Sequence, residues 1–161
     1  MPAKFTSRKS WREKLDRVQE AKIVPIPVKM AKRLGDGTLL IPRPLDVDAV
    51  VRTIKKGKLL TMPLLREKLA RDAGAGVTCP LCTGIFVRIV AEAANEELQA
   101  GKKKVAPYWR VLRENGELNV KFPGGVHEQV KRLRAEGFFI EPGKGKKPPR
   151  VRDFDKYLVK V

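Results

Sequence analysis

The longest regular pattern in the sequence lies between Pro80 and Gln99, where apolar residues recur at helical spacing. The apolar stripe consists of Ile85, Phe86, Ile89, Val90, Ala93 and Ala94. Polar residues lie away from it, namely Arg88, Glu92 and Asn95. This division into an apolar and a polar face predicts one long amphipathic helix, against which neighbouring elements must pack.

A second helical pattern comes directly before this segment. Pro63 suits the first turn of a helix, which is expected to continue from Leu64 to Asp72. Gly74 and Gly76 then break it. Two helices joined by a short glycine-containing turn predict a helix-turn-helix.

Further elements are expected on the N-terminal side of this pair. A helix is predicted from the apolar positions Val47, Val50, Val51 and Ile54, with Asp46 or Asp48 as its cap and a turn at residues 55–57. Gly35-Asp36-Gly37 turns the chain before a short strand at Thr38–Ile41, and residues 58–62 are extended.

The C-terminal side has its own turn signals. Residues 108–118 predict two short strands around Asn115-Gly116, which would form a small wing. Gly124-Gly125 leads into a last helix that is closed by Gly137, with its apolar face formed by Val126, Val130 and Leu133. Residues 143–150 form a basic linker, and residues 151–161 an extended or edge strand.

The N-terminal segment is strongly basic. Its first 33 residues contain ten Lys and Arg against three Asp and Glu, and residues 8–20 place Trp11, Leu15 and Val18 on one helical stripe. Pro25 and Pro27 interrupt any helix beyond this point. We interpret the segment as a nucleic-acid-binding arm; the alternative is an ordinary solvated helix.

Charge and composition narrow the possible partners. The chain of 161 residues has a formal net charge of +17, so polyanions, and nucleic acid first among them, are the expected partners. Its 42% hydrophobic residues allow a real core. No apolar run approaches the length of a membrane span, and no secretory signal is seen, so we expect a location in the cytoplasm, associated with the nucleoid. The expected oligomeric state is a monomer. Two cysteines and one histidine predict neither a disulfide framework nor a metal centre, and no cofactor is expected.

These elements predict an α+β, mainly α fold. We divide it into a basic extension over residues 1–44, a winged helix-turn-helix domain over residues 45–142, and a basic linker with a C-terminal strand over residues 143–161.

The order of motifs in residues 45–140 resembles the DNA-binding domain of the alkylguanine-DNA alkyltransferases and their alkyltransferase-like relatives. The matching pieces are residues 57–74, the helix 79–94, Pro107 to Leu112, Asn115-Gly116, Pro123 to Gly125 and Arg132 to Gly137. The resemblance implies a helix-turn-helix that enters the minor groove, a guanine turned out into a pocket, and a cysteine that accepts the alkyl group.

The sequence departs from this family at the reactive motif. Tyr108 stands at the acceptor cysteine and Trp109 at the activating histidine, while Pro107, Arg110 and Val111 agree with the motif. A phenol is a poor nucleophile at neutral pH and an indole is not a general base, so we expect no alkyl transfer at position 108. Glu136 matches the glutamate of the family's relay, but without the histidine its expected role is structural.

The resemblance also implies binding residues. The expected DNA contacts are Met62, Thr78, Pro80, Arg88, Lys102, Lys103 and Lys104. The expected pocket residues are Tyr108, Trp109, Arg110, Gly124, Gly125 and Glu136. Pro80 lies near the family's intercalating arginine and Met62 at a tyrosine that contacts the flipped nucleotide. These two either act as apolar wedges in a base step or are ordinary helix-start and core residues. Arg110 is expected to hydrogen-bond backbone carbonyls and to hold Tyr108 and Trp109 in place.

Cys79 and Cys82 form a C-x-x-C motif at the start of a helix. Two small buried cysteines are the first interpretation, and a redox or alkyl-accepting role is the alternative.

Three candidate functions follow from the sequence as a whole. The first is a non-catalytic alkyltransferase-like protein that binds duplex DNA, recognises modified guanine and signals to repair proteins. The others are a DNA alkyltransferase that uses Cys79 or Cys82, and a sequence-neutral architectural nucleic-acid binder.

Overall fold

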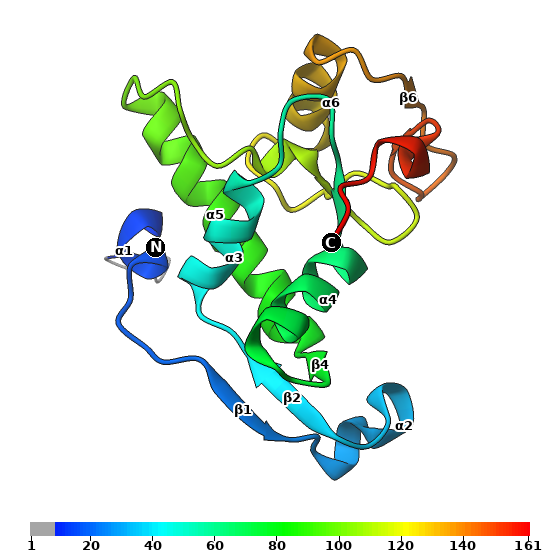
Figure 1. The fold of residues 1–161 in the computed structure, drawn as a ribbon. Helices are drawn as coiled ribbons and strands as arrows, with labels where there is room; N and C mark the ends of the chain where they lie inside the picture. The colour runs from blue at the N-terminus through cyan, green and yellow to red at the C-terminus, as the bar shows by residue number, and fades with distance from the viewer. Residues whose placement is uncertain (1–8) are drawn as a thin grey trace, which may run out of the picture.

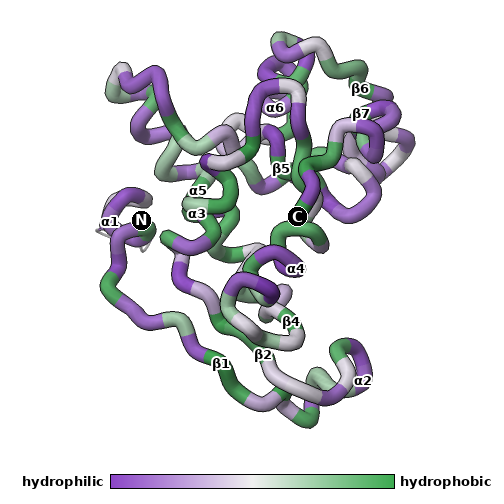
Figure 2. The backbone as a smooth tube through the Cα atoms, viewed as in Figure 1, coloured by the Kyte–Doolittle hydropathy of each residue, from purple (hydrophilic) through white to green (hydrophobic). Residues whose placement is uncertain are grey.

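The computed structural model describes residues 9–161, and its longest helix is α5, Pro80–Gln99, with the bounds that the apolar stripe predicts. Helices α1 (Trp11–Leu15) and α3 (Pro44–Arg52) pack along α5 (Figure 1). The inner face of α5 buries Val87 and Val90, which are both at most 1% exposed. Hydrophilic residues dominate the far end of α5 and the loop that follows it (Figure 2).

The predicted helix-turn-helix is present as a pair of helices. Helix α4, Met62–Ala73, has Pro63 in its first turn and ends at Gly74, whose φ of 71° is a left-handed conformation that favours glycine. The short strand β4, Val77–Thr78, then leads into α5. The turn is tied to α4 because the Thr78 hydroxyl donates to the Arg66 carbonyl at 2.7 Å.

A small sheet joins the N-terminal segment to this pair. Strand β2, Thr38–Ile41, pairs antiparallel with β1, Lys22–Pro25, and parallel with β4. The sequence predicts β2 correctly but gives no sign of β1, which is an edge strand that ends at a proline. Between them lie the 3-10 helix η1, Val28–Met30, and the short helix α2, Ala31–Leu34.

Helix α1 is shorter than the sequence predicts. The helix begins after the Ser10 cap and ends at Leu15, so the expected continuation to residue 20 is wrong. Leu15 is 1% exposed against α5, whereas Val18 is 98% exposed and packs on nothing. The chain leaves the helix at Asp16 to reach strand β1, and this tertiary requirement overrides the local periodicity.

Helix α3 starts earlier than predicted. It begins at Pro44, and neither aspartate is its N-cap. Asp46 instead occupies the third helical position and accepts a hydrogen bond from the Arg43 backbone N–H at 2.9 Å, while Asp48 pairs with Arg52 at 2.8 Å. The predicted core face is correct, since Val47 and Val51 are fully buried.

The predicted two-stranded wing is wrong. The 3-10 helix η2, Tyr108–Arg110, runs into strand β5, Val111–Leu112, whose partner is β3, Leu60–Thr61, in parallel pairing. Asn115-Gly116 does turn the chain, with the Gly116 N–H donating to the Arg113 carbonyl at 3.0 Å. The Arg113 N–H also donates to the Glu117 carbonyl at 2.9 Å, which closes the turn. Leu118, however, donates to the Pro149 carbonyl rather than pairing with β5, so no two-stranded ladder forms.

The rest of the chain forms a second core. Helix α6, Gly125–Ala135, packs near strand β6, Ile140–Glu141, which pairs antiparallel with β7, Arg150–Val151; the 3-10 helix η3, Phe154–Tyr157, follows. This core consists of Leu59, Leu112, Leu118, Leu133, Phe138 and Val151. The tail is strand at Val151 and forms an isolated parallel bridge between Leu158 and Leu59, so the expected edge element is present in part. Trp109 contacts both this core and the core around α5, so it lies at their junction.

No helix among residues 9–161 combines the length and apolar character that crossing a bilayer requires.

Candidate nucleic-acid interface

A hollow of about 640 Å³ lies beside the first turns of α5. Its walls come from α1, from the start of α4 and α5, and from the segment that follows β5. The lining residues are Trp11, Lys14, Met62, Pro80, Leu81, Gly84, Ile85, Arg88, Ile89, Arg113, Asn119, Val120 and Lys121. Four of these side chains are cationic and none is a carboxylate, so the charge of the lining favours anions.

The same hollow exposes apolar side chains. Leu81 and Ile85 are 72% and 51% exposed, and Val120 is 56% exposed. Leu81 and Ile85 are four residues apart on α5 and therefore share one face of the helix. An apolar floor with a cationic rim matches a partner that presents both flat apolar and anionic surfaces, as a nucleic acid does.

Ile85 does not lie on the buried face of α5, where the apolar stripe predicts it. Val90, Ala93 and Ala94 of that stripe are buried as predicted, whereas Thr83 and Val87 are buried in place of Ile85. The broad apolar stripe left the exact direction of the buried face undetermined, because residues on both of its edges are apolar. Packing of α1 and α3 against α5 decides which edge is covered.

The structure brings together three of the expected DNA contacts. Met62, Pro80 and Arg88 all line the hollow, and Arg88 is exposed. Thr78 does not line it, because its side chain is buried and its hydroxyl donates to a backbone carbonyl. The exposed Lys102, Lys103 and Lys104 follow the opposite end of α5, a helix of 20 residues that is roughly 30 Å long.

Two cationic lining residues, Arg113 and Lys121, were missed from the sequence, whereas Lys14 belongs to the basic N-terminal segment interpreted as a nucleic-acid-binding arm. Arg113 and Lys121 belong to no predicted binding motif. Their common signal is a basic residue beside an apolar or turn residue, which is too frequent in this chain to select them.

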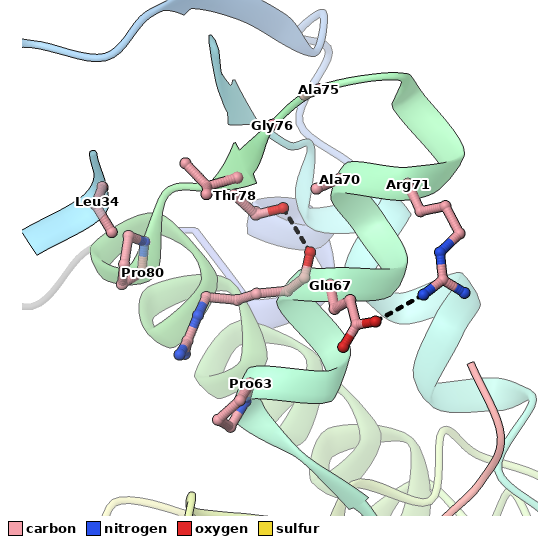
Figure 3. Close-up of a pocket in the computed structure, with 11 residues that line it drawn as sticks. Leu34, Pro63, Glu67, Ala70, Arg71, Ala75, Gly76, Thr78 and Pro80 are labelled. Carbon is pink, nitrogen blue, oxygen red and sulfur yellow. Dashed lines mark hydrogen bonds and ion pairs between the residues drawn. The ribbon is translucent and has the colours of Figure 1, made fainter. Parts of the chain in front are cut away.

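A second hollow, of about 620 Å³, lies between α4, β4 and the start of α5 (Figure 3). It shares Pro80 with the first hollow. Its acidic residue Glu67 is paired with Arg71 at 2.6 Å. Arg66 also lines it, and partial burial lowers the pKa of this guanidinium. With a carboxylate and an internal ion pair in its wall, this hollow is less suited to a polyanion than the first.

Tyr108 is part of the core. It is 1% exposed and makes edge-to-face contacts with Trp109 and Phe122, with ring centroids 5.3 and 5.5 Å away. Its hydroxyl makes no well-formed hydrogen bond among residues 9–161, although the Arg132 guanidinium lies near enough to act on it. Burial raises the pKa of this phenol, and the opposing effect of the Arg132 guanidinium does not cancel the rise. The phenol is therefore protonated at neutral pH and is neither accessible nor nucleophilic.

Trp109, Arg110 and Glu136 form one buried network. Glu136, at the end of α6, accepts from the Trp109 indole N–H at 2.5 Å and from Arg110 Nε at 2.8 Å. Arg110 also donates to the Ile54 carbonyl at 2.6 Å, the kind of backbone contact expected for it. The network joins the end of α3, η2 and the end of α6. The atoms that a proton relay would need are thus engaged in bonds that support the fold.

Gly124 and Gly125 turn the chain into α6. Both have positive φ, at 74° and 65°. A Cβ at Gly124 would lie 2.7 Å from the Glu128 Cβ, so this position also needs glycine for space. Together with Tyr108, Trp109, Arg110 and Glu136, the expected pocket residues are thus neighbours of one junction, with Tyr108 filling its interior.

The two cysteines are poorly suited to nucleophilic chemistry. Cys79 is 7% exposed, and its sulfur accepts a hydrogen bond from the Cys82 backbone N–H at 3.3 Å. Burial, together with the neighbouring Cys79, raises the pKa of the Cys82 thiol to about 12. The reactive thiolate of Cys82 is therefore scarce at neutral pH, and Cys79 is inaccessible because it is buried. Among residues 9–161, no cluster of three or more His, Cys, Asp or Glu side chains could hold a metal ion.

The orphan hydroxyl of Tyr108 leads to a prediction about stability. We expect Tyr108→Phe to leave the melting temperature unchanged or to raise it, because a buried hydroxyl without a partner costs about 1–3 kcal/mol of desolvation. Thermal denaturation measures this. Tyr157→Phe, at a side chain that is 39% exposed, is the matched control and should have no effect. A clear loss of stability in the Tyr108 variant would show that the hydroxyl has a partner after all.

Comparison with known proteins places the architecture in a class. No family model and no curated protein matches the chain. Comparison with solved structures shows that the chain has a mixed, helix-rich α/β fold similar to that of alkyltransferase-like proteins, as the motif order predicts.

Two such structures come from S. pombe. One is Atl1 in complex with damaged DNA containing O6-carboxymethylguanine, at 19% sequence identity and a TM-score of 0.50. The other is ATL in complex with DNA, at 21% identity and a TM-score of 0.52. Each alignment covers 73% of this chain and 94% of the other.

Proposed function

We propose that this chain is a non-catalytic, alkyltransferase-like protein that binds duplex DNA through the hollow beside α5. The observation that carries the proposal is the lining of that hollow, in which Lys14, Arg88, Arg113 and Lys121 surround an exposed apolar floor without any carboxylate. The S. pombe proteins of similar fold were both solved with DNA, which supports the same partner here.

The arrangement assigns different tasks to the two kinds of side chain. The four cations contact phosphates, which supplies affinity and its dependence on salt. Leu81 and Ile85 contact sugars or bases, as the apolar side chains of minor-groove proteins do. Leu81 and Ile85, the more exposed residues of the same surface, thus take the wedge role expected of Pro80 and Met62.

Recognition of modified guanine is the finer part of the proposal. The resembled family accommodates the base near position 108, and the Tyr108 ring is buried here. An extruded base would therefore have to displace the Tyr108 ring or stack on it from outside. Because neither Tyr108 nor the cysteines offer an available nucleophile, the protein would leave a bound lesion intact, and its repair would require other proteins.

Duplex binding at several salt concentrations tests the proposal. We expect the logarithm of the binding constant to fall with the logarithm of salt by about 0.9 per phosphate contact. The double variant Arg113→Ala/Lys121→Ala should reduce this slope by nearly two and weaken binding. Lys55→Ala/Lys56→Ala is the control with the same charge change, since these exposed residues do not line the hollow. Equal losses in both pairs would show that net charge, not the hollow, governs binding.

Two further arms separate the competing functions. Preference for a duplex with one O6-alkylguanine over the unmodified duplex supports lesion recognition, and equal affinity supports a sequence-neutral binder. Mass spectrometry after incubation with the alkylated duplex should find no alkyl adduct on the protein. An adduct on Cys79 or Cys82 would establish alkyl transfer and overturn the non-catalytic assignment.

A further inference from the structure

One aromatic ring at the rim of the hollow is shared by two cations from different elements. The Lys14 Nζ lies 4.0 Å from the centre of the Trp11 ring, and the Arg88 Cζ lies 5.7 Å from it. Trp11 and Lys14 belong to α1, whereas Arg88 belongs to α5. All three line the hollow.

The ring is held firmly in this place. Leu15 of the same helix is buried against the core, and the Trp11 backbone N–H donates to the Glu96 carboxylate. Arg12 adds an ion pair with Glu97 at 3.0 Å. A short helix that is fixed at three points presents its ring and its lysine in a defined geometry, so less ordering is needed when an anion binds.

The two cations lack a close counter-ion. Neither Lys14 nor Arg88 forms an ion pair within the part of the chain that the structure describes. Glu92 acts electrostatically on both cations without forming an ion pair with either, and its pKa is raised, chiefly by burial. Asp16 is engaged by Arg12, and Glu96 by the Trp11 backbone. Two like charges gathered at one ring repel each other, and a bound anion would relieve that repulsion.

We infer that Trp11, Lys14 and Arg88 form a phosphate clamp that grips one segment of the DNA backbone at the edge of the hollow. The ring attracts both cations through its negative face and keeps them at the rim. The clamp rests on the proposed function and gives α1 a specific task in it. Helix α1 is then a docked part of the binding surface, which gives a specific place to the basic arm that the sequence predicts.

The test compares three changes by duplex affinity, salt slope and melting temperature. Lys14→Ala/Arg88→Ala should weaken binding by roughly tenfold or more, since each substitution removes a charge-assisted contact with a phosphate. It should also reduce the salt slope by nearly two. Trp11→Leu should weaken binding while both charges remain, and Trp11→Phe should restore most of the affinity because it keeps a ring. Lys55→Ala/Lys56→Ala is the charge-matched control.

The outcomes separate the clamp from the proposed function. If Lys14→Ala/Arg88→Ala binds like the parent while Arg113→Ala/Lys121→Ala binds weakly, the clamp is wrong and the proposed function stands. If Trp11→Leu and Trp11→Phe lose affinity equally, the ring does not act through its face and the clamp is also wrong. Folded parent protein that fails to bind any duplex overturns both.

Discussion

Replacement of Arg110 by alanine is expected to lower the stability of the protein by about 3–5 kcal/mol, the usual cost of removing one partner from a buried ion pair. The Arg110 and Glu136 side chains are only 13% and 9% exposed. The variant would leave the Glu136 carboxylate with the Trp109 indole as its remaining donor and the Ile54 carbonyl without the guanidinium. For a chain of this size, the loss corresponds to roughly 10 °C in melting temperature, measured by thermal denaturation.

Two comparisons make this prediction specific. Arg134→Ala removes an exposed arginine from the same helix that carries Glu136 and should change the melting temperature little. The double variant Arg110→Ala/Glu136→Gln should be less destabilised than the two single variants together, because it leaves no unpaired buried charge. A stable Arg110→Ala protein that has lost DNA affinity would move Arg110 from the support of the fold to the binding surface.

Replacement of Leu15 by alanine is the second change with a large expected effect. Leu15 is 1% exposed and belongs to the core around α5. Truncation of such a buried leucine costs about 2–5 kcal/mol, so we expect a fall of several degrees or more in melting temperature.

Val18→Ala is the matched control for this prediction. Val18 lies on the same helical stripe in the sequence, yet it is 98% exposed, so its truncation should be neutral. If the two variants were equally destabilised, α1 would continue through Val18 as the periodicity indicates. If both were neutral, α1 would not be docked on α5.

The position of Leu15 changes how the basic N-terminal segment should be studied. A deletion of residues 1–33 would remove Leu15, strand β1 and the Arg12–Glu97 ion pair together with its charge. A loss of DNA binding in that deletion would therefore mix unfolding with lost phosphate contacts. Point substitutions of Lys14 and Arg88 avoid this, because both side chains lie at the surface of the hollow.

Local sequence patterns were sufficient for the main helices. The apolar spacing of residues 80–99 gave both ends of α5, and Pro63 and Gly74 marked α4 closely. The reason is that helix periodicity, first-turn proline and C-terminal glycine act through bonds only a few residues apart. The net charge of +17 and the replacement of the reactive pair by Tyr108 and Trp109 were likewise readable without coordinates.

The tertiary structure decided what those patterns leave open. The burial of Leu15 with exposure of Val18, the outward direction of Ile85 and the pairing of β5 with β3 all depend on contacts between residues far apart in sequence. The same is true of the candidate site, where α1, α5 and the segment after β5 bring Lys14, Arg88 and Lys121 around one hollow. Sequence determined the main helices and the sign of the charge. Packing determined which faces are covered and where the charges meet, because both are properties of the assembled core rather than of any one segment.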